Sequence, residues 1–151
     1  MSGVIVGGKL INGRAIEQKL MAAFEIWAKE DLDDGYFEDQ FKDDKWTYPG
    51  FTRRKSGESA GTIRNIYDLG NLYQSGKESF RITIGTNDIT ASWNWDAKNS
   101  SGNAYALYVH EGLSSNLEPR RWTEDLYVPS KFQASVVSKA LRRRIQALLA
   151  R

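Results

Sequence analysis

One histidine stands beside a carboxylate in this sequence, at His110-Glu111, and this pair is the first candidate for general acid–base chemistry. Neighbouring residues point in different directions on a helix or on a strand, so the two side chains are not expected to act together. A lone histidine beside a glycine bend, here Gly112, is more typical of a hydrogen-bonded structural residue. A small hydrolase that uses His110 and Glu111 is therefore the third of three functional hypotheses.

The sequence lacks the usual motifs of metal-binding and phosphate-binding sites. The chain of 151 residues has no cysteine and one histidine, which excludes thiolate zinc sites and two-histidine sites within one chain. The acids between positions 31 and 44 lack the glycine and the ligand spacing of a calcium loop, although a carboxylate-only metal site stays open. The glycine-containing stretches at 7–8 and 57–61 match no phosphate loop. We expect no cofactor, no metal ligand and no catalytic residue.

Basic and aromatic residues form the candidate interface. Its members are Trp46, Tyr48, Phe51, Arg53, Arg54, Arg142, Arg143 and Arg144. Basic residues interleaved with aromatic ones can bind phosphates and stack on bases, so a small nucleic-acid-binding module is the alternative function. The formal net charge of +2 is too small for a diffuse nucleic-acid binder, and three consecutive arginines on a helix cannot all face one partner.

Length and composition indicate one soluble domain over residues 1–151. Hydrophobic residues make up 40% and charged residues 26%, which is typical of globular proteins of this size. No stretch approaches the roughly 20 apolar residues of a membrane helix. The apolar start Val4-Ile5-Val6 lacks a basic flank and is followed at once by Gly7-Gly8, unlike a signal peptide. We expect an unprocessed protein with no membrane contact.

The first element that would position these residues is an amphipathic helix. Apolar residues at spacings of three and four predict it between positions 14 and 32, with Asn12 as its cap. Acidic residues oppose the dipole at a helix C-terminus, so the run after Leu32 is predicted to be an exit loop that uses positive φ at Gly35. Residues 36–61 carry aromatics without a period and predict an extended arm or long loop, held by its own domain or by a neighbouring subunit.

The remaining elements follow from alternation and turn residues. Residues 80–84 and 89–95 alternate apolar and polar around a turn-forming stretch, which predicts a β-hairpin. Residues 105–111 fit a strand or a short helix that ends at Gly112, and we favour the helix. A long amphipathic helix follows Pro129. This order predicts an α+β fold: a small antiparallel sheet with a β-hairpin, covered by an N-terminal and a long C-terminal helix.

Three ordered segments resemble a known family. Residues 67–75 resemble its D-x-G-x-L-x-x-S signature, residues 105–112 its Y-A-x-x-V-E-x-G segment, and residues 119–122 its P-x-R-P-F element before a last helix. The matching positions, which all suit turns or short helix ends, are Asp68, Gly70, Leu72, Tyr105, Glu111, Gly112, Pro119, Arg120 and Trp122. From about Asp68 to its end the sequence resembles the neck and tail-completion (minor tail-component) proteins of tailed bacteriophages, in which the first segment opens the sheet.

This resemblance implies a structural virion protein and no enzyme. It would be a head-to-tail connector or tail terminator subunit, located at the neck or the head-proximal end of the tail after assembly in the host cytoplasm. The implied partners are further copies of itself in a ring, with a hexamer favoured over a dodecamer, together with other neck, portal-side and tail-tube proteins. Genomic DNA would pass through the lumen without specific binding.

Overall fold

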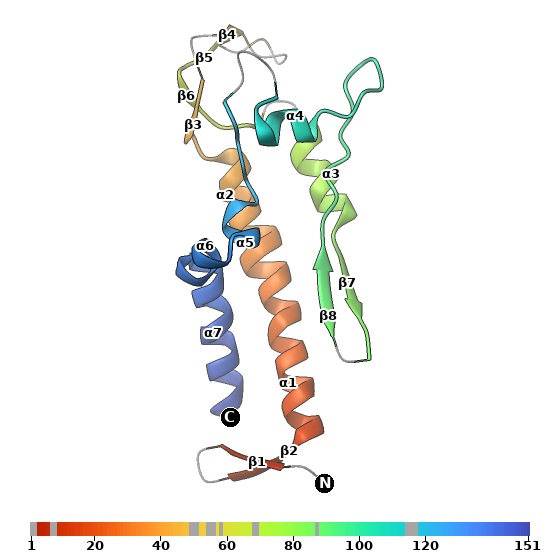
Figure 1. Cartoon of the computed structure of the whole chain (residues 1–151), viewed down its shortest axis with the longest axis vertical. Coiled ribbons are helices and arrows are strands. Elements are labelled where there is room, and N and C mark those ends of the chain that lie inside the picture. The colour runs from red at the N-terminus through yellow and green to blue at the C-terminus, as the bar shows by residue number, and fades with distance from the viewer. Residues whose placement is uncertain are drawn as a thin grey trace.

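The computed structural model describes residues 3–6, 9–48, 52–53, 57, 59–67, 70–86, 88–113 and 118–151. The chain combines helices with small antiparallel sheets, so the predicted α+β class is confirmed. The long helix and the C-terminal helix run along the long axis of the molecule, and β1 and the end of α7 lie near the same end (Figure 1).

A long helix runs through the middle of the molecule. It has three consecutive segments: α1 (Gly13–Ile26), the π-helix η1 (Trp27–Tyr36) and α2 (Phe37–Lys42). Its buried aromatic and aliphatic residues include Trp27, Leu32, Phe37 and Phe41, which follow one another at intervals of five, five and four. The wider turn of a π-helix keeps residues at an interval of five on one face. The long helix therefore buries one continuous stripe.

The exit loop predicted after Leu32 is wrong, and so is the start of the predicted arm at residue 36, because the chain stays helical to Lys42. Gly35 is not among the described glycines with positive φ. The acidic run does not end the helix, because Lys29 and Lys77 form ion pairs with Asp33 and Asp34 and neutralise their charges.

Short paired strands occupy the described part of residues 43–64. They are β3 (Trp46–Thr47) paired with β6 (Ile63–Arg64), and β4 (Thr52–Arg53) paired with β5 (Ser59–Ala60), both antiparallel. They lie at the upper end of Figure 1, beyond α2. Within the described residues, the segment predicted as an extended arm or long loop thus contains two short antiparallel ladders.

The predicted β-hairpin is confirmed. It consists of β7 (Arg81–Ile84) and β8 (Ile89–Ser92), with Arg81 opposite Ser92 and Ile84 opposite Ile89. A helix that the sequence analysis did not predict, α3 (Asn71–Ser79), comes directly before it. The hairpin lies along one side of the long helix, and the C-terminal helix lies along another (Figure 1).

The described residues from 106 to the end form four helices: α4 (Ala106–Glu111), α5 (Glu124–Tyr127), α6 (Pro129–Ala134) and α7 (Val136–Leu149). The short helix favoured for residues 105–111 is confirmed. The long helix expected from Pro129 is instead divided at Ser135, which has extended backbone and whose side chain accepts a hydrogen bond from the Ser138 amide. This cap starts α7 in a new direction, so that it packs along α1 and η1.

A second small hairpin precedes the long helix. Strand β1 (Gly3–Val6) pairs antiparallel with β2 (Lys9–Asn12), and α1 begins directly after β2. Neither strand pairs with a third strand among the described residues. The hairpin crosses the lower end of the molecule in Figure 1, below α1 and α7.

Candidate functional site

Trp122, from the last of the three family-like segments, lies at the centre of an aromatic core. Its side chain is 2% exposed. Its ring centroid is 5.2 Å from that of Phe41, 5.8 Å from that of Trp95 and 4.6 Å from that of His110. These neighbours come from α2, the segment after β8, and α4. Trp122 therefore joins three distant parts of the chain by packing.

Two of the predicted interface residues are used inside the chain. The Tyr48 ring lies 4.0 Å from the Arg64 guanidinium carbon and 5.0 Å from that of Arg120. Both arginines are buried, and contacts of this kind are cation–π interactions. Trp46 donates from its indole nitrogen to the Gln40 carbonyl at 2.7 Å. Trp46 and Tyr48 thus hold their segment against its own domain.

The residues of the first two family-like segments act as helix boundaries and core. Gly70 has φ of +81° directly before α3, and Gly112 has φ of +63° directly after α4. Leu72 is buried, and Tyr105 is half-buried at the start of α4. The first segment opens helix α3 rather than the sheet, contrary to the expectation from the resemblance. Asp68, Phe51 and Arg54 lie outside the described residues, as does the Arg53 side chain, while Pro119 is exposed.

We expect Gly70→Ala to destabilise the protein by about 1–2 kcal/mol, because an L-residue is strained at this left-handed φ. An added Cβ would also lie 2.8 Å from the Tyr67 hydroxyl. Urea unfolding followed by circular dichroism measures the effect. Gly57→Ala is the matched control, since Gly57 has φ of +90° with no described atom within 4 Å of an added Cβ. An equal loss of stability in both variants would assign the effect to backbone strain alone and not to the contact with Tyr67.

His110 and Glu111 contact each other, although sequence neighbours were expected to point apart. His110 Nδ1 lies 2.6 Å from Glu111 Oε1, and His110 Nε2 lies 2.9 Å from the Thr123 hydroxyl. Arg121 Nε donates to the other Glu111 oxygen at 3.1 Å. The His110 hydrogen bond lowers the pKa of Glu111 from its ordinary value.

This cluster has the order hydroxyl, imidazole and carboxylate that is found in nucleophile, base and acid triads. Thr123 is the member that the sequence analysis missed, because nothing in the spacing of 13 residues signals it. However, Trp122 packs against the imidazole edge-on, and neither of the two grooves described below is lined by His110, Glu111 or Thr123. The arrangement links α4 to the residue before α5.

The three predicted interface arginines of α7 differ in their surroundings. Arg144 donates to Asp31 Oδ2 at 2.5 Å from Nε and to Glu30 Oε2 at 2.8 Å from Nη2, in its own chain. The hydrogen bond to Asp31 raises the pKa of Arg144 above its already high value. Arg142 and Arg143 are exposed. Only these two of the three remain available on the surface of α7.

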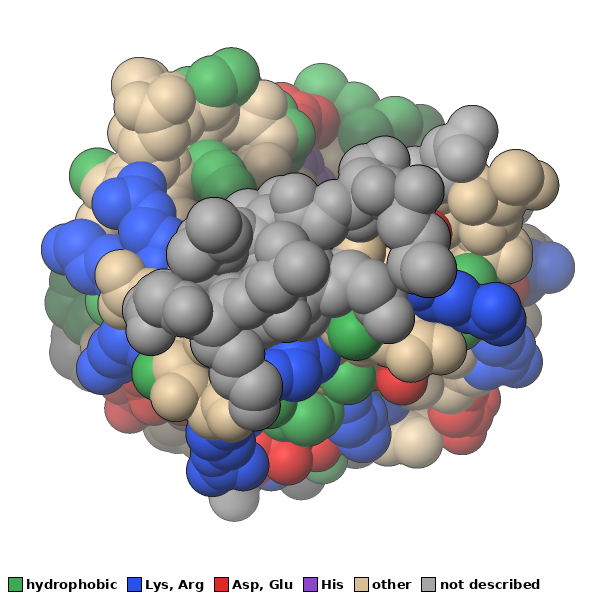
Figure 2. All heavy atoms as spheres, turned by 90° about the horizontal axis from the view of Figure 1, so that it is seen from below, with side chains coloured by type: hydrophobic (Ala, Val, Ile, Leu, Met, Phe, Trp, Pro, Cys, Tyr) green, Lys and Arg blue, Asp and Glu red, His purple; other side chains and the backbone are tan. Residues whose placement is uncertain are grey.

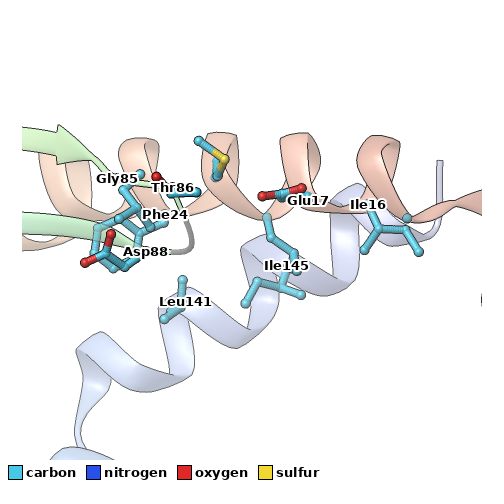
Figure 3. A pocket seen from close by; sticks show the side chains of 12 residues that line it. Ile16, Glu17, Phe24, Gly85, Thr86, Asp88, Leu141 and Ile145 are labelled. Carbon is cyan, nitrogen blue, oxygen red and sulfur yellow. The ribbon is translucent and has the colours of Figure 1, made fainter. Parts of the chain in front are cut away.

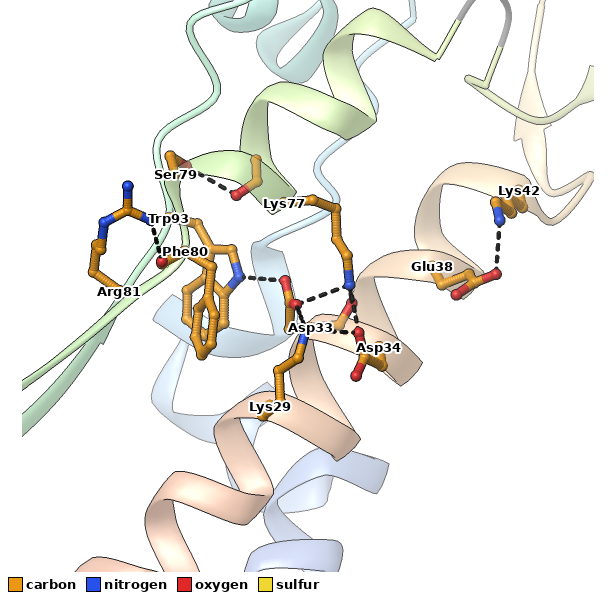
Figure 4. Close-up of polar contacts among 11 residues, drawn as sticks. Lys29, Asp33, Asp34, Glu38, Lys42, Lys77, Ser79, Phe80, Arg81 and Trp93 are labelled. Atoms are coloured by element: carbon orange, nitrogen blue, oxygen red, sulfur yellow. Dashed lines mark hydrogen bonds and ion pairs between the residues drawn. The ribbon is translucent and has the colours of Figure 1, made fainter.

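A buried carboxylate fixes α3 and the hairpin to the long helix. Asp33, in η1, is 1% exposed. One carboxylate oxygen accepts from Lys29 Nζ at 2.6 Å and from Lys77 Nζ at 2.8 Å, and the other accepts from Trp93 Nε1 at 3.0 Å (Figure 4). Lys77 also donates to Asp34 at 2.6 Å. The partners come from η1, from α3 and from the residue directly after β8, so this network joins three parts of the chain.

The contribution of this network to the free energy of unfolding depends on pH, because its carboxyl groups must be ionised. The hydrogen bond from Lys77 lowers the pKa of Asp34. A carboxyl with a lowered folded pKa contributes stability above its unfolded pKa of about 4, and the contribution is lost as pH falls through the folded value. We therefore expect the unfolding free energy to decrease below about pH 4, measured by urea titration. Asp34→Asn should decrease less steeply with pH, and parallel curves would contradict this.

An apolar groove lies between α1, α7 and the tip of the β7–β8 hairpin, with a volume of about 590 Å³ (Figure 3). Its described lining residues are Gly13, Ile16, Glu17, Leu20, Met21, Phe24, Gly85, Thr86, Asp88, Ile89, Leu141 and Ile145. Leu20 remains 40% exposed there. The groove thus presents mostly apolar side chains, with the carboxylates of Glu17 and Asp88 among them.

A second, acidic groove of about 460 Å³ lies between the long helix and α7. Its charged lining residues are Glu30, Asp31, Asp39, Asp43, Lys45, Asp125 and Arg143. Burial lowers the pKa of Lys45. Several separate groups of Lys and Arg side chains surround the lower face of the molecule (Figure 2). Acidic and basic surfaces therefore coexist on one chain.

The described residues hold no group of three or more His, Asp or Glu that could bind a metal ion. In the same part of the chain, no helix is long and apolar enough to cross a membrane. Comparisons with protein-family models, with curated proteins and with solved structures give no match. The phage resemblance therefore stays a prediction based on its three segments.

Proposed function

We propose that this chain is a structural, self-assembling subunit of a tailed-bacteriophage neck or tail-completion ring. The observation that carries the proposal is the open apolar groove between α1, α7 and the hairpin tip. Its aliphatic lining is incompletely buried in the single chain, and exposed apolar surface of this kind is typical of protein interfaces. The ring, the head-to-tail setting and passage of DNA come from the resemblance alone.

The polar clusters support a structural role. Asp33 is enclosed by partners from its own chain, and His110 bridges Glu111 and Thr123 beside a buried tryptophan. In both clusters the polar side chains form hydrogen bonds that link separate elements of the same chain. A heterologous ring also needs two different complementary surfaces on each copy, and the acidic groove and the exposed Arg142 of α7, which does not line that groove, provide opposite charges.

Native mass spectrometry tests the proposal. We expect the purified chain, alone at high concentration or mixed with the proteins encoded beside its gene, to form closed oligomers, with six copies favoured over twelve. Leu20→Asp should shift the population to monomer by placing a charge in the groove, whereas Gln18→Asp, on the exposed surface of the same helix, should not. A chain that remains monomeric under all these conditions would contradict the proposal.

A nucleic-acid-binding module is the second candidate, favoured by the basic groups of the lower face. Under the ring proposal, duplex DNA should bind no better than about 10⁻⁴ to 10⁻⁶ M at physiological salt, because a conduit must let DNA slide. Fluorescence anisotropy at two salt concentrations measures this. Nanomolar binding by a monomer that weakens steeply with salt and with Arg142→Gln or Arg143→Gln would favour the module instead.

A further inference from the structure

We propose that the N-terminal hairpin β1–β2 of one copy docks into the apolar groove between α1, α7 and the β7–β8 tip of a second copy. This inference rests on the proposed self-assembly and names the segment that occupies the groove. It assigns to the first twelve residues a role as the inserted half of an interface.

The hairpin needs a partner by its own composition. β1 contributes Val4, Ile5 and Val6, and β2 contributes Leu10 and Ile11. The backbone register places Val4 opposite Ile11 and Ile5 opposite Leu10, so apolar residues stand opposite each other along the ribbon. A two-stranded hairpin is marginally stable in water by itself.

The hairpin and the groove lie at the same end of the molecule. The groove lining begins at Gly13 and Ile16, directly after β2 ends at Asn12. The most extensive contact of the hairpin outside its own two strands is with the start of α1. A change of backbone direction near Gly13 would therefore carry the hairpin to a neighbouring copy. Exchange of a terminal element between identical copies is a common route to assembly.

Charge supports the same pairing. Lys9 is the only charged side chain among residues 1–12. The charged residues that line the groove are Glu17 and Asp88, both acidic. An apolar ribbon with one cation thus matches an apolar groove with two carboxylates. Val6 stands opposite Lys9 in the register, so Lys9 is a residue of the last backbone pair before the turn.

The natural absence of cysteine permits a clean cross-linking test on the full-length chain. Chains carrying Leu10→Cys are mixed with affinity-tagged chains carrying Leu141→Cys, and oxidation is followed on non-reducing gels. We expect a mixed disulfide dimer at several times the yield obtained with tagged Gln146→Cys, a control on the exposed surface of the same helix. Equal yields would overturn the proposal.

The double variant Leu10→Cys/Leu141→Cys separates docking within a chain from docking between chains. A predominantly intrachain disulfide at all protein concentrations would overturn the proposal, whereas interchain bonds support it. Oligomers that form without the mixed cross-link would overturn this docking and leave the proposed function standing. Monomers under every condition of the mass-spectrometry test would overturn both.

Charge reversal provides an independent readout. Lys9→Glu should weaken association about two- to five-fold, the effect of a partly exposed ion pair. Adding Glu17→Lys to Lys9→Glu should restore the association, while Glu17→Lys alone should weaken it. If the double variant associates no better than either single variant, Lys9 does not face Glu17 and the proposed docking is wrong.

Discussion

Asp33→Asn is expected to destabilise the protein by about 3 kcal/mol, because it removes the charge of a buried carboxylate that accepts hydrogen bonds from Lys29, Lys77 and Trp93. At about 2–4 °C per kcal/mol for a chain of this size, the melting temperature should fall by about 6–12 °C. Differential scanning calorimetry measures the change. The loss affects three parts of the chain together, since the donors belong to η1, to α3 and to the residue directly after β8.

Asp34→Asn is the matched control for Asp33. Its side chain is 48% exposed and accepts from the same two lysines. An ion pair at this exposure is worth less than about 1 kcal/mol, so its loss should change the melting temperature by only a few degrees. Equal effects of the two substitutions would show that the burial of Asp33 contributes nothing beyond the ion pairs.

Trp122→Ala should cost about 3–5 kcal/mol, because it opens a cavity where α2, α4 and the segment after β8 meet. Urea unfolding at neutral pH measures the loss. Trp122→Phe should cost less than about 1.5 kcal/mol, since it keeps an aromatic ring and removes an indole nitrogen that has no hydrogen-bond partner among the described residues.

Tyr127→Ala serves as the control for an aromatic deletion near the same histidine. Tyr127 is 54% exposed, and its ring centroid lies 6.4 Å from that of His110. Its removal should leave the unfolding free energy within about 0.5 kcal/mol of the original value. A larger loss at Tyr127 than at Trp122 would contradict the assignment of Trp122 as the centre of the core.

Local sequence patterns predicted correctly the elements whose structure depends on residues close together in the chain. The alternation on both sides of the turn at residues 85–88 predicted the β7–β8 hairpin, and Gly112 correctly predicted the end of α4. Both features depend on contacts within a few residues. The apolar stripe of the last helix was also recognisable, but the break at Ser135 depends on a single capping hydrogen bond that periodicity does not reveal.

Long-range contacts explain what the sequence reasoning missed. The helix continues past the acidic run because Lys77, 44 residues away, neutralises Asp33. Only the interval of five from Trp27 to Leu32 and on to Phe37 signalled the wider turn. Helix α3 contains Gly76 in its interior, a residue that disfavours helices, yet an added Cβ there would lie 2.2 Å from Trp95 Nε1. Gly76 is needed for packing, and this need overrides its weak helix propensity.

The uninterrupted helix from Gly13 to Lys42 fixes the spacing and the relative rotation of the two ends of the subunit. Removing one residue from it would shorten it by about 1.5 Å and rotate one end against the other by about 100°. The groove near Gly13 would then face a different direction relative to the aromatic core around Trp122, at the other end of this helix. In a closed ring, the angle between neighbouring copies sets how many copies complete the circle. If the chain forms the proposed ring, a change in the length of this helix would therefore change the number of subunits.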